Sequence, residues 1–144
     1  MPFNLQERIK YLNEKTGNLK QNLASFIDLG KQLELDFDFS LASLNQLEMV
    51  LLKLAPDFDQ RKNMDLYEDC WLYLGETYRK ALNGKWQISD DEEYNPTYYN
   101  LPVITDFNAY SDELCPMIII DVFMKNKTRG LLKDQADRYQ HPVG

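Results

Sequence analysis

Few residues of this chain have a type and spacing suited to catalysis, and Glu76 is the foremost of them. Arg79 follows it at the i+3 position of an apolar, helix-like pattern. A carboxylate can act as a general acid or a ligand when a second titratable group lies close by. Asp69 or Asp121 is available for that second role. A hydrolase-like enzyme is therefore one hypothesis, and an ion pair between Glu76 and Arg79 is the other.

Chemistries that depend on histidine or cysteine have little support. The chain has one histidine, His141, four residues from its end, and two cysteines, Cys70 and Cys115. Both cysteines fall in apolar surroundings and are predicted to be buried free thiols. A Cys or Ser nucleophile needs a base beside it, and a zinc site needs several Cys or His ligands. The six glycines are also too far apart to form a phosphate-binding loop. We expect no catalytic residue of these types, no metal and no cofactor.

Acidic residues are concentrated in one stretch. Between Lys85 and Lys125 there is no Lys or Arg, whereas eight residues are acidic. The densest part runs directly into tyrosines, and its candidate partner-binding residues are Asp90, Asp91, Glu92, Glu93, Tyr94 and Tyr98. Such a stretch can be a solvated loop between strands, or a surface that meets a basic protein partner. A hard-cation site is a third reading, but the residues lack the spacing of a calcium loop.

Length and composition exclude several classes of protein. The 144 residues, 44% hydrophobic and 27% charged, predict one globular domain spanning 1–144. A net charge of −7 argues against nucleic acid as a partner. No apolar run is long enough to span a membrane, and the first residues do not resemble a secretory signal. We therefore expect a cytoplasmic protein.

The first half of the chain has the apolar spacing of helices. It predicts helices over 4–14 and 19–30, or one helix bent at Gly17. The alternating run 33–39 predicts an extended connector that aromatic side chains hold to the core. Asp38 or Ser40 then caps the helix with the cleanest apolar stripe, which Pro56 ends.

The second half shows a change of pattern. A further helix is predicted to begin at Asn63 or Asp65 and to end at Asn83-Gly84, where the glycine adopts positive φ. Three β-rich runs follow, 85–88, 101–105 and 117–123, and a last helix covers 128–139. Because the links between the runs are short, we expect antiparallel pairing. The predicted fold is α+β, with three to four N-terminal helices, about three strands and a C-terminal helix.

One segment is predicted to be a structural junction between helix and sheet. A glycine inside a helix costs about 1 kcal/mol relative to alanine, so its presence suggests the close approach of another backbone. A tryptophan at the turn into the sheet is placed to pack across the helix. The residues of this motif are Gly75, Glu76, Arg79, Gly84 and Trp86.

Short motifs across residues 36 to 123 resemble those of small bacterial cytoplasmic proteins, either uncharacterised or of the toxin-immunity type. They are Asp38-Phe39-Ser40-Leu41-Ala42-Ser43-Leu44, Leu74-Gly75-Glu76, Gly84-Lys85-Trp86 and Pro102. The resemblance implies a helical front half, a small sheet and no enzymatic activity. It also implies that the protein binds and blocks a cognate toxin. This role agrees with the acidic surface that the charge distribution predicts.

Three hypotheses therefore stand. The first is a protein-binding inhibitor that uses the acidic, tyrosine-rimmed stretch. The second is an enzyme built on Glu76 and another carboxylate. The third is a homodimeric structural protein that associates through an apolar face of its N-terminal helices. The sequence does not predict the oligomeric state.

Overall fold

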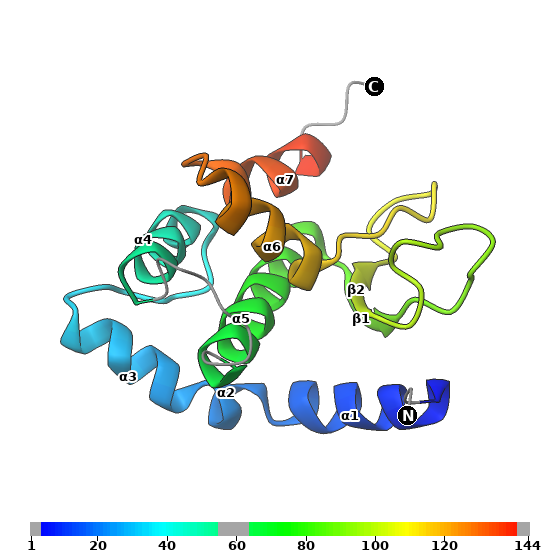
Figure 1. Ribbon diagram of the computed structural model, residues 1–144, viewed down its shortest axis with the longest axis horizontal. Coiled ribbons are helices and arrows are strands. Elements are labelled where there is room, and N and C mark those ends of the chain that lie inside the picture. The colour runs from blue at the N-terminus through cyan, green and yellow to red at the C-terminus, as the bar shows by residue number, and fades with distance from the viewer. Residues whose placement is uncertain (1–3, 55–63, 141–144) are drawn as a thin grey trace.

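A computed structural model describes residues 4–54 and 64–140. In these residues the chain forms helices and one two-stranded antiparallel sheet, which confirms the α+β class (Figure 1). The elements in order are α1 (Leu5–Gly17), α2 (Leu19–Asn22), α3 (Ala24–Gln32), the 3₁₀ turn η1 (Leu41–Ser43), α4 (Leu44–Leu54), α5 (Met64–Leu82), β1 (Lys85–Ile88), β2 (Pro102–Thr105), α6 (Pro116–Asn126) and α7 (Leu131–Gln140). No helix in the described ranges has the length and apolarity to cross a membrane.

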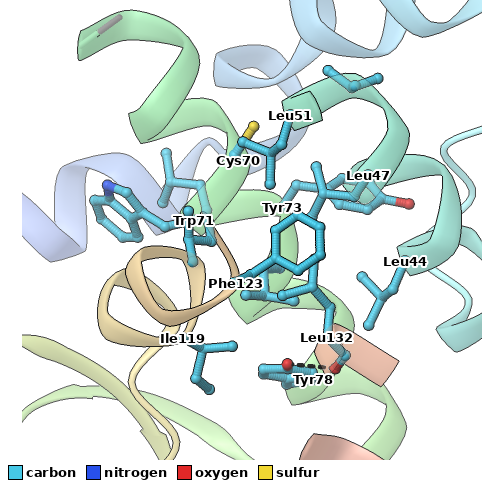
Figure 2. Packing of buried hydrophobic residues seen from close by; sticks show 14 of the residues in the cluster. Leu44, Leu47, Leu51, Cys70, Trp71, Tyr73, Tyr78, Ile119, Phe123 and Leu132 are labelled. Atoms are coloured by element: carbon cyan, nitrogen blue, oxygen red, sulfur yellow. Dashed lines mark hydrogen bonds between the residues drawn. The ribbon is translucent and has the colours of Figure 1, made fainter. Parts of the chain in front are cut away.

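The core is built around α5, which is buried on all sides along its middle. Every residue from 70 to 78 is shielded from solvent. Helices α4, α6 and α7 supply the aliphatic and aromatic side chains that surround it (Figure 2). Tyr78, fully buried, donates its hydroxyl to the Leu132 carbonyl oxygen at 2.6 Å. Cys70 and Cys115 are buried free thiols, as predicted.

The N-terminal helices are broken at two places. Asn18 separates α1 from α2, and Leu23 separates α2 from α3. The break next to Gly17 agrees with the predicted interruption, whereas the second break was not expected. Leu23 is fully buried and its backbone leaves the α region only slightly, so the apolar stripe continues across the break. The spacing of the apolar residues therefore predicts one helix over 19–30, whereas the structure has two helices, α2 and α3.

The connector 33–39 lies in extended or irregular conformation and is held to the core by aromatic side chains, as predicted. Tyr73 of α5 packs against the rings of Phe37 and Phe39, with centroid distances of 4.9 and 4.7 Å. Its hydroxyl also accepts a hydrogen bond from the Phe39 amide at 2.9 Å. The Ser40 side chain caps η1 by accepting from the Ser43 amide, which confirms one of the two predicted caps. The predicted boundaries at Pro56 and Asn63 fall outside the described residues.

The sheet has two strands, so the predicted third strand is wrong. β1 pairs with β2 in antiparallel register, with Lys85 opposite Thr105 and Ile88 opposite Pro102. Residues 117–123 instead belong to α6, which begins at Pro116. Proline is favourable in the first turn of a helix, and burial of the isoleucines against α5 overrides their β propensity. Leu114, just before this helix, adds one isolated bridge to Ile104.

One backbone conformation and one helix boundary also differ from prediction. At the end of α5, Asn83 rather than Gly84 adopts positive φ, at 57°. Gly84 is needed for space, because a Cβ there would lie 3.0 Å from the Thr105 carbonyl oxygen. The last helix begins at Leu131 instead of Thr128, because Gly130 has a φ of 95°.

Candidate functional site

The carboxylate of Glu76 is fully engaged by its neighbours. Its two oxygens accept from Arg79, Oε1 from Nε at 2.6 Å and Oε2 from Nη2 at 2.7 Å. The Trp86 indole donates to Oε1 at 3.2 Å, and only 11% of the Glu76 side chain is exposed. This geometry fits the predicted junction, with both oxygens of Glu76 held by neighbouring side chains. The enzyme hypothesis loses its central residue.

Gly75 provides the space that the junction requires. A Cβ at this position would lie 2.5 Å from Cζ2 of Trp86, well inside van der Waals contact. The element that approaches the helix is thus a side chain and not another backbone, which corrects the prediction. Trp86 also packs edge-on against Trp71, with 6.1 Å between ring centroids. Gly75, Trp86 and Trp71 together fix β1 against α5.

Substituting Gly75 by alanine is expected to lower the free energy of unfolding by about 1–2 kcal/mol. The clash with Trp86 costs about 1–3 kcal/mol, and the higher helix propensity of alanine offsets part of it. Urea denaturation measures the change. In the G75A/W86L double variant, the added methyl group meets a smaller side chain, so its cost relative to W86L alone should vanish. An equal cost of G75A in both backgrounds would contradict the packing described.

The other candidate catalytic carboxylates lie in different surroundings. Asp69 sits near the start of α5, where Glu68, Asp65 and Lys15 act on it electrostatically. Asp121, on α6, interacts with Tyr67. Within the described ranges, no three His, Cys, Asp or Glu residues are grouped so as to hold a metal ion.

The predicted acidic stretch forms the long loop between β1 and β2. Asp90, Asp91, Glu92 and Glu93 are all exposed there. The Asp91 carboxylate accepts the Tyr94 amide at 2.9 Å, which shapes the turn that presents the four side chains. None of them forms an ion pair with a described residue. Their charges are therefore directed into solvent.

A second acidic loop, residues 106–113, lies beside the first. Glu113 joins the two, because its Oε1 accepts from Ser89 Oγ at 2.9 Å and from Asn95 Nδ2 at 3.0 Å. The Tyr94 hydroxyl adds a bond to the Tyr110 carbonyl oxygen at 3.2 Å. Figure 1 shows the two loops projecting together from the sheet, away from α4. Seven of the eight acidic residues between Lys85 and Lys125 thus lie on adjacent loops, and Asp121 lies apart on α6.

Exposed tyrosines accompany these acids. Tyr94 is 59% exposed and Tyr110 is 78% exposed, with Tyr99 at 37%. Tyr98, one of the predicted contact residues, is half-buried, and burial raises the pKa of its hydroxyl. Tyr99 and Tyr110 were not among the predicted contact residues, although both fall in the stretch without basic residues. We define the paired-loop surface as the exposed residues Asp90, Asp91, Glu92, Glu93, Tyr94, Tyr99 and Tyr110.

Comparison with known proteins identifies no relative whose function could be compared with this chain. No protein-family model, no curated protein and no solved structure matches this chain. The functional interpretation therefore depends on the arrangement of the residues themselves.

Proposed function

We propose that this protein binds a protein partner with a basic surface through the paired-loop surface and blocks that partner by covering it. The observation that carries the proposal is the set of four exposed carboxylates on the first loop, which form no ion pair with a described residue and lie beside the exposed tyrosines of both loops. The sequence between Lys85 and Lys125 has no Lys or Arg, and Lys85 itself pairs with Asp106 of the second loop at 3.6 Å. Exposed tyrosines lie near the acids of the first loop. No chemical step is required for an inhibitor of this kind.

Electrostatics and contact chemistry both support this function. Uncompensated carboxylates on one side of a molecule accelerate encounter with a positive surface and orient it. Tyrosines supply large contact areas at a small loss of side-chain entropy. In the free protein, Glu113 already connects the two loops by accepting hydrogen bonds from Ser89 and Asn95. Such preorganisation reduces the entropy lost on binding.

The cytoplasmic, toxin-immunity role is the specific form of the proposal. A cognate toxin with a basic surface would meet the paired-loop surface and lose access to its own target. Occlusion predicts that inhibition of the toxin rises with occupancy and ends at a one-to-one ratio. A hydrolase-like activity has no comparable support, because Arg79 and Trp86 engage the Glu76 carboxylate.

Site-specific photo-crosslinking in extracts of the source cell tests the proposal. A crosslinking amino acid at Tyr110 is expected to capture a basic protein, and about 0.5 M salt should abolish the capture through screening. The matched control carries the same group at Asp28, an exposed position on α3. Capture of the same proteins from both positions, or of none from Tyr110, would contradict the function.

A further inference from the structure

A groove lies between α4, the connector 33–39 and the turn that joins α6 to α7. Its volume is about 340 Å³, at the lower end of the range for small-molecule sites. We define the α4 groove by its lining residues, which are Leu33, Leu35, Met49, Val50, Leu52, Lys53 and Arg129. Most of them are apolar and two are cationic, a composition typical of sites that bind a small molecule with one polar group.

Hydrogen bonds fix the walls of the α4 groove on both sides. On one side, the Asp36 amide donates to Gln46 Oε1 at 2.7 Å, which ties the connector to α4. On the other side, Arg129 donates from Nε to Glu48 at 3.0 Å and from Nη2 to the Asn45 carbonyl oxygen at 3.1 Å. The groove is therefore formed in the free protein, and a preformed site loses less entropy when a ligand binds.

The floor of the α4 groove is apolar and accessible to solvent. The side chain of Met49 is 49% exposed, and Leu33, Leu35 and Leu52 are only half-buried. An apolar ligand would remove this surface from water, which is the favourable part of hydrophobic binding. Methionine also adapts to ligands of different shape, because its side chain is unbranched and flexible.

The polar part of the α4 groove carries positive charge. Lys53 is exposed and forms no ion pair with a described residue. The charge of Arg129 is matched by Glu48, so Lys53 supplies the positive charge that is left over. Glu34 and Asp36, which alternate with the two leucines of the connector, do not line the groove. A carboxylate is therefore a head group that complements this end of the site.

We propose that the α4 groove binds a small anionic amphiphile, a medium-chain carboxylate whose alkyl chain lies on Met49 and the leucines and whose head group meets Lys53 and Arg129. The site goes beyond the proposed function and does not depend on it, because α4 lies at the opposite end of the molecule from the two acidic loops (Figure 1). The apolar floor selects the alkyl chain, and the lysine selects the sign of the charge.

Titration of the ¹⁵N-labelled protein with hexanoate, octanoate and decanoate tests the site, with amide chemical shifts as the readout. Decanoate is expected to shift the amides of 33–35, 49–53 and 129–130 in a saturable way and to leave those of 89–95 unchanged. Because each buried methylene contributes to binding, the dissociation constant should fall about four- to fifteenfold from one carboxylate to the next. Octylammonium, which has the chain of octanoate and the opposite charge, should bind clearly more weakly than octanoate.

A pair of matched variants tests the role of the lysine. K53Q is expected to weaken octanoate binding about two- to fivefold, the range for an exposed ion pair. K20Q removes the same charge at an exposed position on α2 and should keep the wild-type affinity. Binding of 1-octanol, which has no charge, should be the same in K53Q and in the wild type.

Four results would overturn the proposal. The first is the absence of a saturable response of the groove amides to decanoate. The second is equal affinity for octanoate and octylammonium, which would make the groove an unselective apolar surface. The third is an equal effect of K53Q and K20Q on octanoate binding. The fourth is movement of the groove amides when the ligand-free protein is diluted, which would assign the groove to a second copy of the chain.

Discussion

Reversing the charge of the first acidic loop is expected to slow association with the captured partner by about 10- to 100-fold at low salt. The variant D90K/D91N/E92K/E93K removes the field that steers a basic surface. Asparagine at position 91 keeps an oxygen to accept the Tyr94 amide, so the turn is preserved. Because the four side chains are exposed, the free energy of unfolding should change by less than about 1 kcal/mol. Stopped-flow association rates over a range of ionic strength measure the effect.

A control with the same net charge separates a local surface from an overall charge effect. The variant E14K/D28K/D36K/D134N changes four exposed positions on other parts of the molecule. Both variants raise the net charge from −7 to zero. The control should associate much faster than the loop variant. Equal slowing of the two would mean that total charge, and not the paired-loop surface, governs encounter.

Removing the carboxylate of Glu48 is expected to cause the largest loss of stability. Glu48 is completely buried on α4 and accepts from the Gly130 amide at 2.8 Å and from the Leu132 amide at 3.1 Å. Arg129 Nε also donates to it, at 3.0 Å. Alanine would leave these donors at the start of α7 without an acceptor, at a cost of about 3–5 kcal/mol. Urea denaturation of E48A measures this loss.

Two further variants identify the source of the effect. E48Q keeps one acceptor oxygen and should cost clearly less than E48A. Met49→Ala, the neighbouring position on α4, changes a side chain that is 49% exposed and should cost less than about 1 kcal/mol. If E48A were no more destabilising than M49A, Glu48 would not be the cap that ties α7 to α4.

The helices and the hairpin were predictable because their signals are local. The periodic leucines of α4 and the β-rich runs at 85–88 and 101–105 appear in the right elements. The run at 117–123 failed because its isoleucines favour a strand, while the proline before it and burial against α5 favour a helix. Glu48 was not singled out, since the need for an acceptor arises only when α7, more than eighty residues later, packs on α4.

The negative charge of the candidate surface could be predicted from the sequence, whereas the arrangement of its two loops could not. The acidic stretch identified Asp90 to Glu93 and Tyr94, all exposed in the structure. The position of the second loop beside the first could not be predicted. It depends on hydrogen bonds from Ser89 and Asn95 to Glu113, which are distant in the sequence and meet only in the folded chain. The side on which Tyr98 and Tyr110 point is likewise decided by the loop backbone. The pairing of Glu76 with Arg79 was predictable, since i and i+3 residues are neighbours on a helix.

Cross-saturation from the captured partner to the amides of this protein measures most directly where the two meet. The account predicts that saturation is transferred to residues 89–101 and 106–113 together, and is lost in the loop variant at the same protein concentrations. Saturation confined to α1, α3 or α4, with both loops unaffected, would contradict the claim that the paired-loop surface binds the partner.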